Sequence, residues 1–151
     1  MVAMGAGVLY TAHTPKAGAV GDWRDLPDLI AEVDILSLHV PLTDETAGMI
    51  DAPAIARMKP GAVLINTARR GLVDEAAMVA ALAEGRLAGA GLAAVAEEPP
   101  PRDHPLFAFD SVILAPHLAW LTAETLDRSL VVAVENRRRL AAGDELLRRV
   151  A

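Results

Sequence analysis

Cysteine is absent from this 151-residue sequence, which excludes disulfide bonds, thiolate metal sites and cysteine nucleophiles. Aromatic residues make up only 3 % of the chain. Basic residues are outnumbered by acidic ones, 14 to 20, so the net charge is −6. Because binding to a phosphate backbone requires a basic face, this charge balance disfavours nucleic acid as a partner.

Long apolar runs are also missing. No run approaches the roughly 20 residues that a membrane-spanning helix needs, and Met1 is not followed by a basic segment and a signal-peptide core. We therefore expect a cytoplasmic protein with no membrane segment. No two of the four histidines stand at the close spacing of metal ligands, so we predict no metal site. These histidines are His13, His39, His104 and His117.

The sequence is rich in apolar residues that form short, patterned runs. Hydrophobic residues make up 53 % of the chain and the mean hydropathy is +0.32, which is enough for one globular domain with a sizeable core. Strands are expected at 8–11, 35–40, 62–66, 87–95 and 112–114. Helices are expected behind Asp25, from Asp51, over 75–84 behind Asp74, and from Thr122 to Gly143. This alternation predicts an α/β fold with a parallel, doubly wound sheet.

Three of the expected strands lead into side chains that can do chemistry. Arg69 follows the run 62–66, Glu98 follows 87–95, and His117 follows 112–114. The ligand crevice of an open α/β sheet lies at the carboxyl ends of its strands, so a guanidinium, a carboxylate and an imidazole should converge there. A histidine after a proline is more often an ordinary loop residue, and this spacing alone leaves the choice open.

Five motifs occur in a fixed order along the chain. They are LSLHVPLT (36–43), MKPGAVLINTAR (58–69), GLVDE (71–75), EEP (97–99) and PH (116–117). This set closely resembles the D-isomer-specific 2-hydroxyacid dehydrogenases, over about residues 4–139. The segment 117–120 is most similar to the branch that contains hydroxypyruvate/glyoxylate reductases and glycerate dehydrogenases.

The resemblance implies reversible hydride transfer between NAD or NADP and a small 2-oxo acid such as hydroxypyruvate or glyoxylate. It also implies catalytic roles for three residues. His117 would protonate the carbonyl oxygen, Glu98 would hydrogen-bond the other ring nitrogen, and Arg69 would bind the substrate carboxylate. Arg69 and His117 would also contact the cofactor, together with Val40, Pro41, Thr46, Thr67 and Ala68.

Two departures from the family pattern bear on these roles. Arg70 stands where the family has glycine, so either arginine is a candidate for the carboxylate-binding role. The eight-residue step from Asn66 to Asp74 favours Arg69. Ala93 replaces an aspartate that in the family contacts the nicotinamide carboxamide, and this change puts the orientation of the cofactor in doubt.

The loop after the first expected strand bears on the choice of cofactor. An acidic residue in such a loop binds the adenosine ribose of NAD, whereas a nearby cation accommodates the 2′-phosphate of NADP. Residues 12–16 contain no acid, and His13, Thr14 and Lys16 are candidate phosphate contacts. An ordinary solvated turn is equally compatible with this composition, so NAD and NADP both stay open.

A glycine-rich phosphate-binding turn of G-x-G-x-x-G type should follow the first strand of such a domain. The segment 5–8 does not fit because it precedes a strand. The resemblance therefore predicts that residues 1–151 are a partial dinucleotide-binding domain. They would form an incomplete Rossmann-type doubly wound parallel sheet that lacks its first strand and glycine-rich turn, with the substrate domain absent.

Such a chain should be inactive, or nearly so, in isolation. The alternative is a non-catalytic binding or oligomerisation module derived from such an enzyme; full-length members of the family are expected to form homo-oligomers, notably dimers. With the central strand missing from the order 3-2-1-4-5-6, strands 8–11 and 35–40 should stand apart from the other three. We expect the gap to close by pairing of 8–11 with 63–66, or the chain to associate.

Overall fold

The computed structural model describes residues 5–93, 95, 99–116, 118 and 121–148. These residues belong to two compact units, one that ends at Pro116 and one that begins at His117. The first unit contains the strands β1 (Leu9–Tyr10), β2 (Asp22–Trp23), β3 (Ile35–Leu38), β4 (Ala62–Asn66), β5 (Leu87–Leu92) and β6 (Val112–Leu114). Its helices are α1 (Leu26–Glu32), α2 (Ala52–Arg57) and α3 (Glu75–Ala83), with short 3-10 turns η2 (Arg70–Leu72) and η3 (Pro105–Ala108).

The helices of the first unit begin where the sequence predicts. Each starts at an aspartate whose carboxylate accepts a hydrogen bond from the backbone amide three residues later, at 2.9–3.2 Å. These N-caps are Asp25, Asp51 and Asp74. Such a cap satisfies an amide that the helix itself leaves unpaired and is worth about 1 kcal/mol. The predicted helix starts are therefore confirmed.

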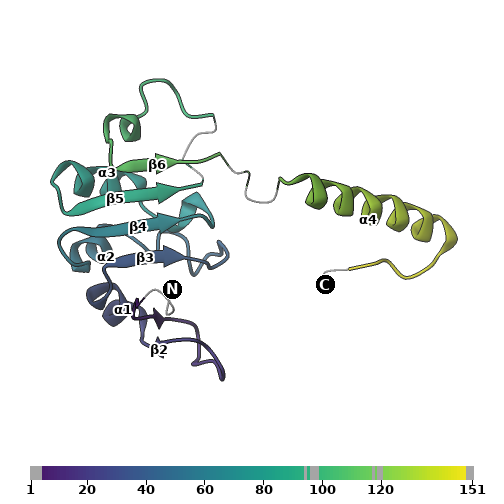
Figure 1. The fold of residues 1–151 in the computed structure, drawn as a ribbon, viewed down its shortest axis with the longest axis horizontal. Helices are drawn as coiled ribbons and strands as arrows, with labels where there is room; N and C mark the ends of the chain where they lie inside the picture. Colours follow the sequence, from purple (N-terminus) through teal and green to yellow (C-terminus); the bar gives the residue numbers. More distant parts are fainter. Residues whose placement is uncertain (1–4, 94, 96–98, 117, 119–120, 149–151) are drawn as a thin grey trace. The chain divides into compact units, whose positions relative to one another are not determined.

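The four strands β3, β4, β5 and β6 form one parallel sheet, in that order. Their last residues pair in a single row, Leu38 with Asn66, Asn66 with Leu92, and Leu92 with Leu114. The strand arrows in Figure 1 accordingly end at one edge of the sheet. The residues that follow these strands are thereby brought to a common carboxyl edge, as predicted for the α/β fold.

The pairing of the two N-terminal strands differs from our expectation. β1 pairs in parallel with β2, a strand that the sequence did not predict, and these two form a separate sheet. The prediction that 8–11 and 35–40 together stand apart from the other three strands is wrong for 35–40, because β3 belongs to the four-stranded sheet. Pairing of 8–11 with 63–66 is also wrong, because β4 already has β3 on one side and β5 on the other. Within the described residues, no strand pairs with the second edge of β3.

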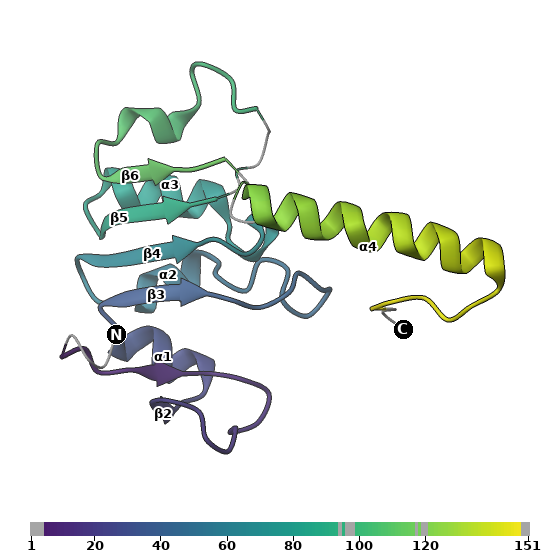
Figure 2. The same cartoon turned by 45° about the vertical axis from the view of Figure 1, so that its right-hand side comes forward.

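The core lies between the four-stranded sheet and the helices. Alternate strand residues such as Leu36, Leu64 and Leu92 are buried together with Ile55 of α2 and Met78 of α3. Figures 1 and 2 both place α2 and α3 on the same face of this sheet. Leu64 has no exposed surface, and full burial of such a side chain stabilises the fold by about 1.5–3 kcal/mol. The core therefore fixes the strands from which the carboxyl-edge loops emerge.

Glycines in β5 allow close approach by neighbouring strands. A Cβ atom at Gly89 would lie 2.5 Å from the backbone oxygen of Ser111, just before β6, and one at Gly91 would lie 2.9 Å from Ile65 Cδ1 of β4. The small residues of this strand therefore serve strand packing.

The second unit is built on helix α4 (Ala123–Ala142). Thr122 caps its first turn by accepting from the Thr125 amide at 3.2 Å, and Gly143 ends it in the left-handed conformation. Backbone hydrogen bonding at Glu124 and the Thr122 hydroxyl hold the pKa of the Glu124 carboxyl below its usual value. Both predicted ends of this helix are confirmed.

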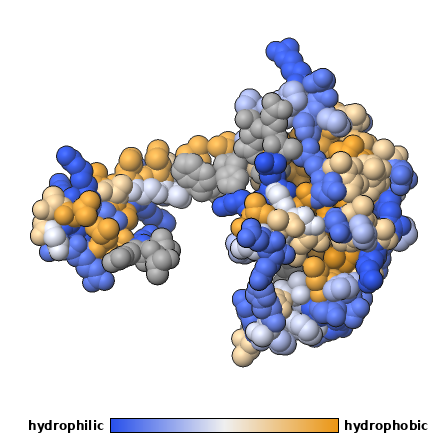
Figure 3. All heavy atoms as spheres, turned by 180° about the vertical axis from the view of Figure 1, so that it is seen from behind, coloured by the Kyte–Doolittle hydropathy of each residue, from blue (hydrophilic) through white to orange (hydrophobic). Residues whose placement is uncertain are grey.

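Apolar side chains on α4 remain at the surface. None of its residues is buried in the described part of the chain. Orange apolar atoms accordingly stand beside charged blue ones on this unit in Figure 3. Leu130, Val131 and Leu140 are each more than half exposed. Among the residues that the structure describes, no helix is long and apolar enough to cross a membrane.

Candidate functional site

A cleft of about 630 Å³ opens at the carboxyl edge of the four-stranded sheet. The loops that leave β3 and β4 form its walls. These loops lie side by side because the strand register places Leu38 beside Asn66. Its lining residues are His39, Val40, Pro41, Leu42, Thr67, Ala68 and Arg69. The volume is typical of small-molecule sites, and the crevice beyond parallel strand ends is where α/β sheets bind ligands. Five of the predicted cofactor-binding residues thus meet at one place: Val40, Pro41, Thr67, Ala68 and Arg69.

A buried amide holds the loop that carries Arg69. Asn66 is the last residue of β4 and is only 2 % exposed. Its Nδ2 donates to the backbone oxygen of Arg69 at 2.8 Å, and its Oδ1 accepts from the amide of Ala68 at 3.2 Å. The loop is thereby folded back on the strand end. Sequence reasoning used Asn66 only as a spacing marker and did not identify this role.

The opposite wall is held by Thr46. Its hydroxyl donates to the Pro41 carbonyl at 2.7 Å and accepts from the Thr43 amide at 2.8 Å. Thr46 is not among the residues that line the cleft, so its predicted contact with a cofactor stays a prediction. Its observed contacts shape the loop that presents Val40 and Pro41.

Replacing Thr46 by Val should destabilise this loop. The substitution keeps the side-chain volume but leaves the Pro41 carbonyl and the Thr43 amide without their hydrogen-bond partner. We therefore expect the free energy of unfolding to fall by about 1 kcal/mol. Urea denaturation measures this change. Thr46→Ser, which keeps the hydroxyl, is the matched control and should lose less than half as much. Equal losses in the two variants would show that the methyl group, not the hydrogen bonds, supports the loop.

His39 and Leu42 line the cleft although neither was predicted as a site residue. The Nε2 atom of His39 lies 2.8 Å from the hydroxyl of Ser37 on β3, so the imidazole is oriented by the strand that precedes it. Leu42 lies under Gly71, where a Cβ atom would come within 2.9 Å of Leu42 Cδ2. The sequence signal that could have identified both was their place in the motif 36–43, beside Val40 and Pro41 at the end of the expected strand 35–40.

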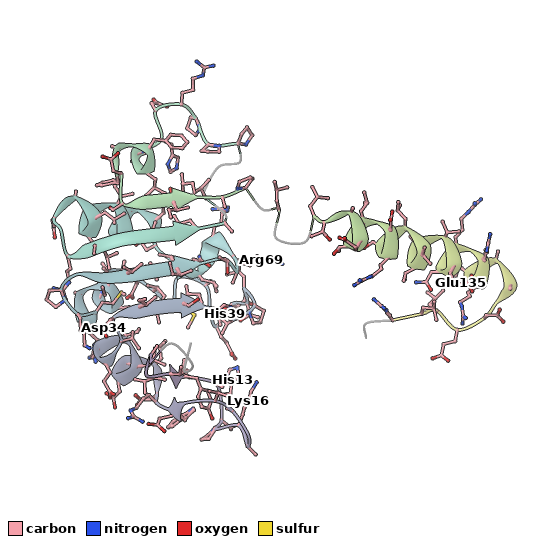
Figure 4. The ribbon with its side chains drawn as sticks, in the orientation of Figure 1. His13, Lys16, Asp34, His39, Arg69 and Glu135 are labelled. Atoms are coloured by element: carbon pink, nitrogen blue, oxygen red, sulfur yellow. The ribbon has the colours of Figure 1, made fainter. Side chains whose placement is uncertain are left out.

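Arg69 carries the positive charge of the cleft. Its side chain is exposed, and Nη1 donates to the carbonyl of Ala68 at 2.7 Å. No carboxylate within the described part of the chain forms an ion pair with it. Arg70, the alternative candidate, opens the turn η2 and does not line the cleft. Figure 4 shows Arg69 and His39 at the same edge of the sheet. A forked donor that forms no ion pair with the described carboxylates is suited to a carboxylate ligand.

The loop after β1 is ordered by two aromatic side chains. The Tyr10 hydroxyl accepts from the Lys16 amide at 2.9 Å and donates to the Lys16 carbonyl at 3.3 Å. Trp23 Nε1 donates to the Ala12 carbonyl at 3.2 Å. His13 and Thr14 are exposed between these anchors, and Figure 4 shows His13 and Lys16 beyond the end of β1. The loop is therefore held in place while its polar side chains face solvent.

Two predicted catalytic residues, Glu98 and His117, lie outside the described residues. Their neighbours in sequence are placed. The amide of Ala93 donates to the Asn66 carbonyl at 3.0 Å, and the amide of Ala115 donates to the Leu92 carbonyl at 2.8 Å. Both chain segments thus leave the sheet at its carboxyl edge. In the part of the chain that is described, no three His, Asp or Glu residues gather as a metal ion would require.

The residues of the cleft fit the nicotinamide end of a dinucleotide. Val40, Pro41 and Leu42 offer an apolar wall to a planar ring, while Thr67 and Arg69 offer polar donors on the opposite loop. Such a pairing of apolar surface with a few convergent polar groups is typical of cofactor sites.

Comparison with known proteins gives a consistent answer. The sequence profile of the "D-isomer specific 2-hydroxyacid dehydrogenase, NAD binding domain" family matches residues 1–119. A glyoxylate reductase of Aeropyrum pernix is 44 % identical over 147 residues, which cover 93 % of this chain and 43 % of the relative. A D-3-phosphoglycerate dehydrogenase of Mycobacterium tuberculosis is 46 % identical over 144 residues, which cover 91 % of this chain and 27 % of the relative.

A solved structure shares both fold and sequence. The NADPH-dependent glyoxylate/hydroxypyruvate reductase of Sinorhizobium meliloti, in complex with NADP and malonate, matches with a TM-score of 0.89 and 34 % identity. The match covers 99 % of this chain and 47 % of that one. The chain therefore spans less than half the length of each of these three proteins. On the evidence of its profile, its sequence relatives and its fold, the chain belongs to the D-isomer-specific 2-hydroxyacid dehydrogenase family.

Proposed function

We propose that this chain supplies the nicotinamide side of an oxidoreductase site. The reaction is transfer of a hydride between NAD(P)H and a small 2-oxo acid, of the glyoxylate or hydroxypyruvate type. The observation that carries the proposal is the cleft in which Arg69 stands opposite Val40 and Pro41, at the carboxyl edge of the sheet. The names of the glyoxylate reductase and glyoxylate/hydroxypyruvate reductase relatives support this substrate class.

Arg69 is proposed to bind the substrate. Its guanidinium would hold the carboxylate of the 2-oxo acid through paired hydrogen bonds and draw electron density from the adjacent carbonyl. The Asn66 side chain supports this role, because it fixes the backbone on both sides of Ala68 and Arg69. The reduced nicotinamide, when bound, supplies the hydride that adds to the carbonyl carbon.

Glu98 and His117 are proposed to complete the proton chemistry. The imidazolium of His117 would give its proton to the carbonyl oxygen as the carbon is reduced, which leaves a neutral imidazole and a hydroxyl group. Glu98 would accept a hydrogen bond from the other ring nitrogen, fix the tautomer and favour the protonated ring before transfer. These roles rest on the motif positions of the two residues.

The cofactor is proposed to be NAD or NADP, with its adenosine end at the loop after β1. His13, Thr14 and Lys16 are the candidate contacts to a 2′-phosphate. The absence of an acidic residue from positions 11–16 supports binding of NADP as well as NAD. Tyr10 and Trp23 support the proposal because they hold this loop in one conformation.

A non-catalytic binding or oligomerisation module is the competing proposal. It is favoured by Ala93, which stands where the family has a nicotinamide-contacting aspartate, and by Arg70 in place of glycine. In this case the chain would bind nucleotide or a second copy of itself without turnover. Both proposals expect a homo-oligomer. Sedimentation measures the oligomeric state.

Two measurements on two samples separate the proposals. The first measurement is the binding of NADH and of NADPH, followed by fluorescence. The second is the oxidation of NADH or NADPH in the presence of glyoxylate, hydroxypyruvate or phosphorylated hydroxypyruvate. The samples are the 151-residue chain and the same chain made with whatever coding sequence adjoins it in frame. We expect both to bind cofactor, with turnover confined to the second. If both samples bind cofactor and neither shows turnover, the non-catalytic module is supported. If neither sample shows binding or turnover, the proposed function is refuted.

A further inference from the structure

The connection between β1 and β2, residues 11–21, contains no helix or strand, yet two side chains hold it. The Tyr10 hydroxyl binds both backbone groups of Lys16, accepting from its amide at 2.9 Å and donating to its carbonyl at 3.3 Å. Trp23 Nε1 donates to the carbonyl of Ala12 at 3.2 Å. The start and the middle of this connection are therefore attached to the β1–β2 sheet.

Both anchors come from one position of that sheet. Tyr10 and Trp23 are partners in the parallel register of β1 with β2. Leu9, the residue before Tyr10, packs against the core of the first unit. Because successive strand residues face opposite sides, the Tyr10 ring lies on the side away from the core. The phenol hydroxyl is thereby free to bind the loop.

The connection carries cationic groups and no acid. Residues 8–21 contain no Asp or Glu but include His13 and Lys16, which Figure 4 shows beyond the end of β1. Lys16 is exposed and forms no ion pair in the part of the chain that the structure describes. A carboxylate in such a loop binds the ribose diol of NAD, whereas a cation binds the 2′-phosphate of NADP. Residues 8–21 therefore offer donors to a phosphate and no carboxylate to a diol.

We propose that Lys16, held by Tyr10, makes the proposed cofactor site prefer NADP to NAD. The ammonium group of Lys16 binds the 2′-phosphate. Tyr10 is a positioning residue that acts through the Lys16 backbone and does not contact the cofactor. A loop already held in its binding conformation loses less conformational entropy when the ligand binds, which raises affinity without a new contact. This inference rests on the proposed function, because it assigns a preference to the cofactor site proposed there.

The test compares the dissociation constants of NADPH and NADH for the 151-residue chain and two variants, by fluorescence titration. Lys16→Gln should raise the constant for NADPH about tenfold and that for NADH less than twofold, because it removes one charge-assisted hydrogen bond. Tyr10→Phe should raise the NADPH constant about threefold to fivefold, again with less than twofold change for NADH. This variant keeps the ring, and water replaces the lost hydroxyl at the exposed Lys16 amide, so the fold is retained.

Lys59→Gln is the matched control. Lys59 is the only other lysine of the chain, and its Nζ atom lies 2.9 Å from Asp34 Oδ1. These two residues precede β4 and β3, so the pair lies at the amino edge of the four-stranded sheet. The substitution removes the same charge as Lys16→Gln and should leave both dissociation constants within twofold of their original values.

Two adenine nucleotides provide a readout that depends neither on nicotinamide nor on turnover. Adenosine 2′,5′-bisphosphate differs from adenosine 5′-monophosphate only by its 2′-phosphate. Calorimetry should show about tenfold tighter binding of the bisphosphate, a difference that Lys16→Gln abolishes. Tyr10 is the only tyrosine of the chain, so selective labelling gives its ring a single assigned set of NMR signals. These signals should shift more with the bisphosphate than with the monophosphate.

The outcomes separate this inference from the proposed function. Equal affinity of the unmodified chain for NADPH and NADH, or an unchanged NADPH constant in Lys16→Gln, would overturn the preference and leave the proposed function standing. A Tyr10→Phe variant that binds NADPH as the unmodified chain does, or that loses NADH and NADPH affinity alike, would overturn the positioning role. If the unmodified chain binds neither cofactor, the inference fails together with the proposed function.

Discussion

Replacing Arg69 by Lys should lower kcat/KM for 2-oxo acid reduction about 10²- to 10³-fold while NADPH affinity changes less than threefold. Lysine keeps the charge but loses the planar fork that holds a carboxylate through two parallel hydrogen bonds. Loss of one donor that stabilises developing charge at a carbonyl oxygen typically has this size of effect. Steady-state kinetics in the sample that shows turnover, with cofactor fluorescence titration alongside, measures both quantities.

Arg70 provides the matched control for this prediction. It is adjacent in sequence and also exposed, but it opens η2 and does not line the cleft. Arg70→Lys should therefore leave kcat/KM within about twofold of the original value, since surface substitutions away from a site have small effects. A larger loss in Arg70→Lys than in Arg69→Lys would reverse our assignment of the two arginines.

Replacing Asn66 by Ala should lower the free energy of unfolding by about 2–4 kcal/mol. The side chain satisfies the Ala68 amide and the Arg69 carbonyl from a buried position. Each buried group left without a partner costs about 1–3 kcal/mol, and the whole stability of a domain is about 5–15 kcal/mol. Denaturation in urea measures the loss, which should be accompanied by weaker substrate binding because Arg69 is no longer held.

Thr67 is the neighbouring control for Asn66. It is exposed and its side chain makes no hydrogen bond among those the structure describes, so Thr67→Ala should change stability by no more than about 0.5 kcal/mol. If Asn66→Ala is as mild as Thr67→Ala, solvent reaches the freed amide and carbonyl, and the rigid loop that we describe is not required for stability.

Local features of this fold were predictable from the sequence because their causes are local. Asp25, Asp51 and Asp74 precede apolar periodic runs and cap helices in the structure. The strand 62–66 was predicted with its observed bounds, since Pro60 and Gly61 stop the preceding helix and a β-rich run follows. In each case a few adjacent residues determine the backbone, and distant contacts only reinforce it.

Strand pairing was not predictable in the same way. Asp22–Trp23 is two residues long and has no alternating pattern, so nothing local marks β2 as a strand. Whether β3 lies beside β1 or β4 depends on packing between segments far apart in the chain. A parallel pair, unlike a hairpin, carries no turn motif that specifies its partner. The errors in our sheet order arose because β2 was not predicted, so that 35–40 was assigned the third place in the order 3-2-1-4-5-6; β2 pairs with β1 and holds that place, and β3 holds the fourth.

The candidate site was predictable in part. The motifs located both loops of the cleft, and the register of β3 with β4 brought them together as the rule for strand ends requires. His39 and Leu42 were not predicted because the family resemblance assigned no role to either of them. The buried position of Asn66 could not be read from the sequence, because burial of a strand-end amide depends on how segments distant in the chain pack around it.

The backbone ladders of the first unit have a consequence for its mechanics. One ladder joins β1 to β2 and another joins β3 through β6, and no backbone pairing between them occurs in the described residues. The proposed adenosine contacts follow β1, whereas the proposed nicotinamide contacts follow β3 and β4. Leu9 of β1 packs against the core cluster of the first unit, so side-chain packing and not a backbone hydrogen bond connects the two ladders. A dinucleotide bound as proposed would contact both ladders and add a second connection, whereas a mononucleotide would contact only one of them.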